Sequence, residues 1–184
     1  MTAGIWLGVT AALLAVTAQV AGITQASAES LDLAGTAALG PESRAVTLRL
    51  TCEPKTGIAA TLTVPLFTGL SFDFDGLEGP SGSTAPLAEL RTVTGSGVRT
   101  TRVRASGAVA ADPATSFTLT VAPARRGEAP LREVALALAE PGAKLVWTQG
   151  SPRKGDAPVV ATFVVAEGQT ASLRTTVSPC LQGF

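Results

Sequence analysis

The sequence predicts an all-β fold: a single-domain β-sandwich, or alternatively a small β-barrel, with one disulfide and a cleaved signal peptide before it. Three observations support this fold class. Short runs of alternating hydrophobic and polar residues recur along the chain, clusters of Gly, Pro, Ser and Asp separate them, and the only two cysteines lie far apart. Many short strands joined by such turns are typical of sandwiches and barrels.

The N-terminal 28 residues resemble a secretory leader. An apolar run from Ile5 to Gly22 precedes Ala26-Ser27-Ala28, and a small-x-small tripeptide after such a run is typical of a signal peptidase site. We therefore expect cleavage after Ala28, a mature chain that begins at Glu29, and a periplasmic or secreted protein with no membrane span after cleavage. The alternative is a retained anchor, because the run approaches the roughly 20 residues that a spanning helix needs.

Residues 29–184 have the size of one ordinary domain, and we predict that they form a single β-rich domain. The chain has 14 basic and 14 acidic residues and contains neither His nor Tyr. The lack of His excludes Ser-His-Asp and Cys-His catalysis and removes the commonest metal ligand. Aromatic residues are scarce, so the core must consist mainly of Val, Leu and Ala. We expect no cofactor.

Cys52 and Cys180 are predicted to form a structural disulfide, because an isolated pair in an oxidising compartment usually does. Neither residue lies in a Cys-x-x-Cys context, which argues against a redox role. The alternative is two free thiols. The bridge is expected to connect an early strand with the last one.

The first two predicted strands form a hairpin. In residues 46–52 the hydrophobic side chains alternate with Thr and Arg, and residues 58–66 repeat this period of two. The intervening residues 53–57 have turn chemistry. The side chains expected to face inward are Val46, Leu48, Leu50 and Cys52, followed by Ile58, Ala60, Leu62, Val64 and Leu66.

Five later runs are also predicted to be strands. They comprise residues 70–75, 102–105, 117–121, 158–165 and 173–177. In the first of them Leu70, Phe72 and Phe74 alternate with Ser71, Asp73 and Asp75. The run at 158–165 is almost entirely apolar and β-branched, as is typical of a central strand.

Leu131–Glu140 is ambiguous. Leu131, Val134 and Leu138 fit one face of a helix, whereas Val134, Leu136 and Leu138 fit one face of a strand equally well. The β-rich neighbours favour a strand. Gly76–Pro86 is the longest evident loop, and loops of that length are often functional.

Asp73, Asp75 and Glu78 lie close together beside a Gly turn. Such carboxylates could bind Ca²⁺, but the set is incomplete for an EF-hand loop, so no metal is expected. They could also act as an acid/base pair in a small hydrolase. The alternative is that Asp73 and Asp75 form the solvent face of a strand.

Basic residues are concentrated in residues 91–126, which contain six arginines and one acid. Arg99, Arg102 and Arg104 are therefore a candidate binding face for an acidic protein, a lipid headgroup or a polysaccharide. The alternative is that they pair with Asp73 or Asp75 across neighbouring strands. Nucleic acid is not an expected partner of an exported chain with no net charge.

The sequence thus favours an exported, non-enzymatic binding or accessory module of the bacterial cell envelope, which contacts another envelope or extracellular protein or an acidic ligand. One alternative is a small hydrolase built on the clustered carboxylates. Another is a structural subunit of a surface assembly. Such a subunit would need an unpaired apolar edge for strand addition, and Val159–Val165 is the candidate.

Overall fold

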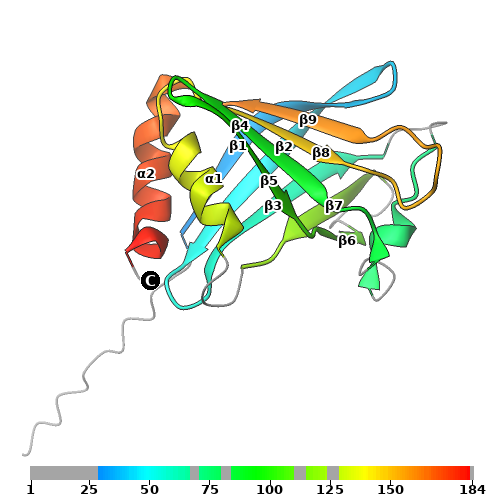
Figure 1. The fold of residues 1–184 in the computed structure, drawn as a ribbon, viewed down its shortest axis with the longest axis horizontal. Coiled ribbons are helices and arrows are strands. Elements are labelled where there is room, and N and C mark those ends of the chain that lie inside the picture. The colour runs from blue at the N-terminus through cyan, green and yellow to red at the C-terminus, as the bar shows by residue number, and fades with distance from the viewer. Residues whose placement is uncertain (1–28, 67–70, 80–83, 110–114, 124–128, 183–184) are drawn as a thin grey trace, which may run out of the picture.

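The alternating sequence pattern builds a β-rich fold in the computed structural model, which describes residues 29–66, 71–79, 84–109, 115–123 and 129–182 (Figure 1). The predicted leader lies outside these residues. The strands are β1 (Glu29–Leu39), β2 (Glu42–Glu53), β3 (Gly57–Pro65), β4 (Ala88–Thr94), β5 (Gly97–Val103), β6 (Ser106–Val109), β7 (Ser116–Val121), β8 (Lys144–Gln149) and β9 (Val159–Val164). The helices are the 3₁₀ helix η1 (Asp75–Leu77), α1 (Pro130–Leu138) and α2 (Glu167–Leu181).

The nine described strands form one curled sheet in the order β5-β4-β8-β9-β1-β2-β3-β7-β6, and every neighbouring pair is antiparallel. The strands at the two ends of this order, β5 and β6, are consecutive in the chain. Only Arg104 and Ala105 separate them. The sheet must therefore curl until its two edges meet at that corner. The prediction of an all-β fold is confirmed in its main part, because the described fold is nearly all-β, with two short α-helices.

The inner face of the sheet carries the hydrophobic core. In β2 the side chains of Val46, Leu48, Leu50 and Cys52 are at most 5% exposed, whereas the intervening residues point outward. Val, Leu and Ala supply most of the core, as expected, and the largest fully buried side chains are Trp147 and Phe163. Leu66 differs from its prediction, because it lies beyond the end of β3 and is 38% exposed.

The seam between β1 and β9 is short. Gly35–Ala38 pairs with Val160–Phe163, which is four residue pairs, whereas β1 and β2 share eleven. At Gly35 an added Cβ would lie 2.4 Å from Cδ1 of Phe163 and 2.4 Å from the backbone oxygen of Thr162. Glycine therefore lets the Phe163 ring close over β1 at this seam.

The predicted strand at Leu131–Glu140 is wrong, because α1 occupies residues 130–138. Leu131, Val134, Ala135 and Leu138 are buried, which is the spacing of one helical face. Pro130 stands in the first turn, where its missing N–H is harmless. The helix packs against β4 and β5 on one side and β3 on the other, so it fills the space between separated parts of the curled sheet.

The predicted strand at residues 173–177 is also wrong. This segment belongs to α2, whose buried residues lie on one helical face: Thr170, Leu173, Thr176, Val177 and Cys180. The helix packs against β1, β2 and α1, and Figure 1 shows both helices at the same end of the sheet. The disulfide is confirmed between Cys52 and Cys180, with a Cα–Cα distance of 5.8 Å. It connects β2 with a helix instead of the last strand.

The described part of the predicted strand at 70–75 is not a strand. The chain turns there and enters η1. Phe72 and Phe74 instead join Phe117 in an aromatic cluster, with successive ring centroids 4.5 and 4.9 Å apart. The run at 158–165 does form a central strand, because β9 pairs with both β8 and β1. Val159–Val165 is therefore not an edge for strand addition.

Candidate functional site

The three candidate arginines do not share one face. The register of β4 and β5 places Arg99 opposite Thr92, whose side chain is buried, and Arg102 opposite Glu89 on the outer face. Arg104 lies beyond the end of β5, where its Nη1 donates to the carbonyl oxygen of Ala85 at 3.4 Å. Arg99 and Arg102 therefore belong to two different surfaces.

Each of these two arginines has its own carboxylate partner. Nε of Arg102 donates to Oε1 of Glu89 at 2.9 Å, and Nη1 of Arg99 lies 3.9 Å from Oε2 of Glu133 on α1. Both pairs are exposed, and exposed pairs contribute at most about 1 kcal/mol. The partner of Arg102 is thus a neighbour on β4, not Asp73 or Asp75.

The outward-facing residues of β5, β4, β8 and β9 form three rows in register, which we name the outer valine face. One row contains Val98, Val93, Lys144 and Val164; the next contains Thr100, Arg91, Val146 and Thr162; the third contains Arg102, Glu89, Thr148 and Val160. Val98 is 54% and Val164 59% exposed. Among the described residues neither Arg91 nor Lys144 forms an ion pair. The face therefore combines apolar surface with uncompensated positive charge.

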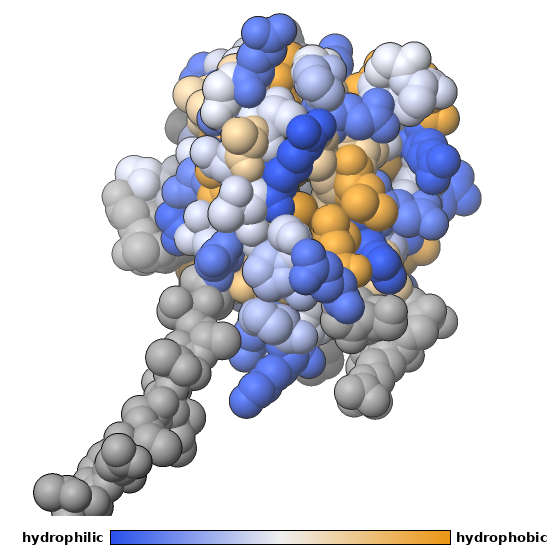
Figure 2. Space-filling view, turned by 90° about the vertical axis from the view of Figure 1, so that its left-hand side faces the viewer, coloured by the Kyte–Doolittle hydropathy of each residue, from blue (hydrophilic) through white to orange (hydrophobic). Residues whose placement is uncertain are grey.

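A groove separates the β4–β5 hairpin from α1, and we name it the edge groove. Its volume is about 480 Å³, and its walls include Thr92 and Arg99 on the sheet and Leu136 on the helix. Oγ of Ser96 donates to Oε1 of Glu140 at 3.2 Å, which ties the hairpin to the end of α1. Figure 2 views the molecule from the side where the helices lie and shows a hydrophobic area bordered by hydrophilic residues.

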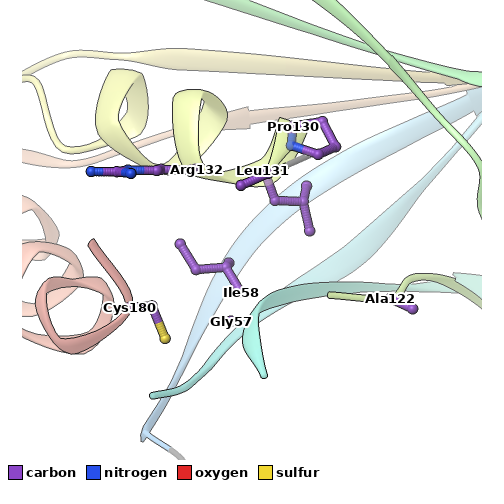
Figure 3. A pocket seen from close by; sticks show the side chains of 8 residues that line it. Gly57, Ile58, Ala122, Pro130, Leu131, Arg132 and Cys180 are labelled. Carbon is purple, nitrogen blue, oxygen red and sulfur yellow. The ribbon is translucent and has the colours of Figure 1, made fainter. Parts of the chain in front are cut away.

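A smaller pocket lies beside the disulfide (Figure 3). The side chains of Ile58 and Leu131 face it, whereas Arg132 points away, and Nη2 of Arg132 donates to the carbonyl oxygen of Leu181 at 3.0 Å. The pocket volume is about 20 Å³, which is room for about one water molecule. This pocket is too small for a ligand.

The candidate carboxylates Asp73, Asp75 and Glu78 do not converge. Oδ1 of Asp73 accepts a hydrogen bond from the backbone N–H of Gly76 at 3.0 Å, so this carboxylate stabilises the turn into η1. Asp75 begins that helix and Glu78 follows it. Within the described part of the chain, no three Asp, Glu or Cys side chains are grouped so that they could hold a metal ion.

A polar cluster that the sequence reasoning missed joins two distant loops. Asp156 accepts hydrogen bonds from Oγ of Ser71 at 2.5 Å and from Oγ of Ser151 at 2.7 Å. These bonds, aided by the charge of Arg153, lower the pKa of the Asp156 carboxyl. Ser71 and Asp156 are 85 residues apart in sequence, so no local pattern could have paired them. The cluster fixes the loop before η1 to the loop between β8 and β9.

The pH dependence of stability tests this cluster. The folded-state pKa of Asp156 lies below its ordinary value, as does that of Asp32, whose pKa is lowered by the hydrogen bonds from Arg49. Both carboxylates therefore contribute stability above their unfolded pKa of about 3.9 and lose it as the pH falls through the folded value. Between pH 7 and pH 2, Asp32→Asn/Asp156→Asn should lose less stability than the wild type in urea titrations. Equal losses would contradict the assignment.

Neither the known family models nor the curated proteins and solved structures contain a match to this chain. In the ranges that the structure describes, no helix is both long and apolar enough to cross a membrane.

Proposed function

We propose that the protein is a non-enzymatic binding module that works outside the cytoplasm, in the cell envelope, and contacts an acidic partner protein through the outer valine face. The Cys52–Cys180 disulfide supports the compartment, because it is of a kind that persists in oxidising environments.

The observation that carries the proposal is the register of the outer valine face. It places Arg91 and Lys144 in adjacent rows on adjacent strands, with Val98 and Val164 at the ends of one row. Neighbouring side chains on one sheet face lie about 4.5–5.5 Å apart, so a flat partner surface can contact several at once. The apolar side chains supply buried area, and the cations supply orientation and association rate.

Local charge, not overall charge, should govern binding, because the formal net charge of the chain is zero. Reversing two cations in Arg91→Glu/Lys144→Glu should weaken binding to immobilised poly-L-glutamate by about tenfold or more, since like charges then face the acidic probe. Added salt should weaken wild-type binding and affect the variant less. Surface plasmon resonance at several salt concentrations measures both effects.

The matched control is Lys55→Glu/Lys154→Glu, which changes the net charge equally at two exposed positions outside the outer valine face. This control should retain most wild-type binding, and the melting temperatures of all three proteins should agree closely. Equal loss of binding in both double variants would mean that the face has no specific role. If the control retains binding, capture from envelope extract with the same three proteins would identify the natural partner.

A further inference from the structure

We infer that β5 and α1 form a second recognition site, in which the edge groove takes an extended segment of a partner polypeptide. That segment carries a hydrophobic side chain and, two residues along, a lysine or arginine. The site lies on the inner side of the hairpin, and it shares with the outer valine face only the strand β5, whose Val98 also lines the groove.

The first argument is the free backbone edge of β5. Thr94 and Gly97 pair across a two-residue turn, and such flanking residues form a hydrogen-bonded pair. Hydrogen-bonded and non-hydrogen-bonded pairs alternate along an antiparallel ladder. The N–H groups of Arg99 and Thr101 therefore point toward β4, and those of Val98 and Thr100 point away from it. Among the described residues, no strand pairs with that second edge. It can therefore hold an extended segment through main-chain hydrogen bonds.

The second argument is the shape of the edge groove. Its volume of about 480 Å³ falls in the range of about 300–1,000 Å³ that is typical of ligand sites. Leu136 is 49% exposed on its helical wall, and Thr92 is only 3% exposed on the sheet. Alternate side chains of an added strand point to the same face, so every second residue of the segment would enter the groove beside Leu136.

The third argument is charge. Glu133 on α1 and Glu140 just after it line the groove together with Leu136, and the one base among the residues that line the groove is Arg99. One carboxylate is therefore uncompensated, and the C-terminal end of the helix adds negative potential beside Glu140. Ser96 contacts Glu140 and Arg99 lies near Glu133, so the carboxylate of Glu140 lies nearer the hairpin turn than that of Glu133. Residues i and i+2 of a strand share one face about 6.6 Å apart, so a segment with a hydrophobic residue on Leu136 can place a basic one near Glu140.

The occupant is a short segment of another protein and not a second copy of this chain. At its Val103 end β5 runs into the corner with β6, and only two residues separate the two strands. A strand that belongs to a folded domain, such as a second copy of this chain, would have to continue past that corner, where β6 begins. A free segment of a few residues can instead lie along the half of β5 that begins at Gly97.

A randomised eight-residue peptide library displayed on phage tests this inference. Peptides enriched on the wild-type protein should share the hydrophobic-x-basic pattern. Thr100→Pro should weaken the best peptide by about tenfold or more, because proline removes a free-edge N–H but leaves the bonds to β4. Leu136→Asp should do the same without touching the strand. Leu87→Asp, which makes the same substitution at a leucine that is 43% exposed and lies outside both the edge groove and the outer valine face, is the matched control and should bind normally.

Glu140→Lys provides the sharpest test, because it should change the selected pattern from basic to acidic at the second position. Enriched peptides that bind Leu136→Asp and wild type equally, or a failure to enrich any peptide, would overturn the inference. Analytical ultracentrifugation tests whether the occupant is instead a second copy of this chain. A wild-type dimer that becomes monomeric in Thr100→Pro would overturn the partner segment in favour of a second copy.

Discussion

Replacing Cys52 and Cys180 together with serine is expected to lower the free energy of unfolding by about 4–5 kcal/mol. The two residues are 128 positions apart in sequence, so the bridge removes a large part of the conformational freedom of the unfolded chain. It also fixes α2 to β2 at a site where both sulfur-bearing residues are 1% exposed. Urea unfolding followed by circular dichroism measures the loss.

Reduced wild-type protein is the control for this variant, and its unfolding midpoint should fall by a similar amount. Thiol titration of the denatured, unreduced protein should find no free thiol. If the serine variant retained the stability of the oxidised wild type, the bridge would contribute little, and packing alone would hold α2 against β2.

Trp147→Ala is expected to cost about 3–5 kcal/mol. Trp147 is fully buried on the inner face of β8 between β4 and β9, and removing its indole would leave a large cavity in a core with few aromatic side chains. Chemical unfolding monitored by circular dichroism is the appropriate measurement.

Trp147→Phe should cost less than half as much as Trp147→Ala. The indole Nε1 of Trp147 is buried and has no hydrogen-bond partner among the described residues, and a buried unpaired donor is itself destabilising by about 1–3 kcal/mol. Phenylalanine fills most of the volume and removes this donor. Equal losses in the two variants would indicate that the N–H makes a stabilising hydrogen bond in the folded protein.

The strands that could be predicted are those whose alternation is regular and whose inner face is fully buried. Residues 46–52 and 117–121 meet both conditions and lie in β2 and β7. The strands β1, β4 and β8 were not predicted. Their runs include small or polar residues at inward positions, such as Gly35, Thr92 and Gln149, which weaken the hydrophobic period.

Hydrophobic periodicity could not predict the two α-helices, because their sequences fit the period of two that is typical of a strand as well as the period of 3.6 that is typical of a helix. In α1 a run of Leu, Val and Ala satisfies a period of two as well as 3.6, and packing against β4 and β3 decides between them. In α2 the β-branched Thr175, Thr176 and Val177 favour a strand locally. The burial of Leu173 and Cys180 against β2 overrides that preference.

The surfaces depend on register, which sequence periodicity does not determine. Arg99, Arg102 and Arg104 were predicted to form one binding face. The pairing of β5 with β4 assigns Arg102 and Arg99 to opposite faces. Arg91 and Lys144 were missed as members of a face with Arg102, because they come from β4 and β8, and only strand pairing brings them together.

The late position of β9 in the sequence affects how the sheet can form during synthesis. Ribosomes complete β1 first, but the strand that pairs with its second edge begins only at Val159. During most of synthesis the Gly35–Ala38 edge of β1 therefore has no neighbouring strand. Cys52 cannot form its disulfide until Cys180, late in the sequence, has been made. Exposed strand edges promote wrong pairing. We therefore expect chains truncated before β9 to aggregate, and binding factors that act on nascent or unfolded chains to be most needed at this stage.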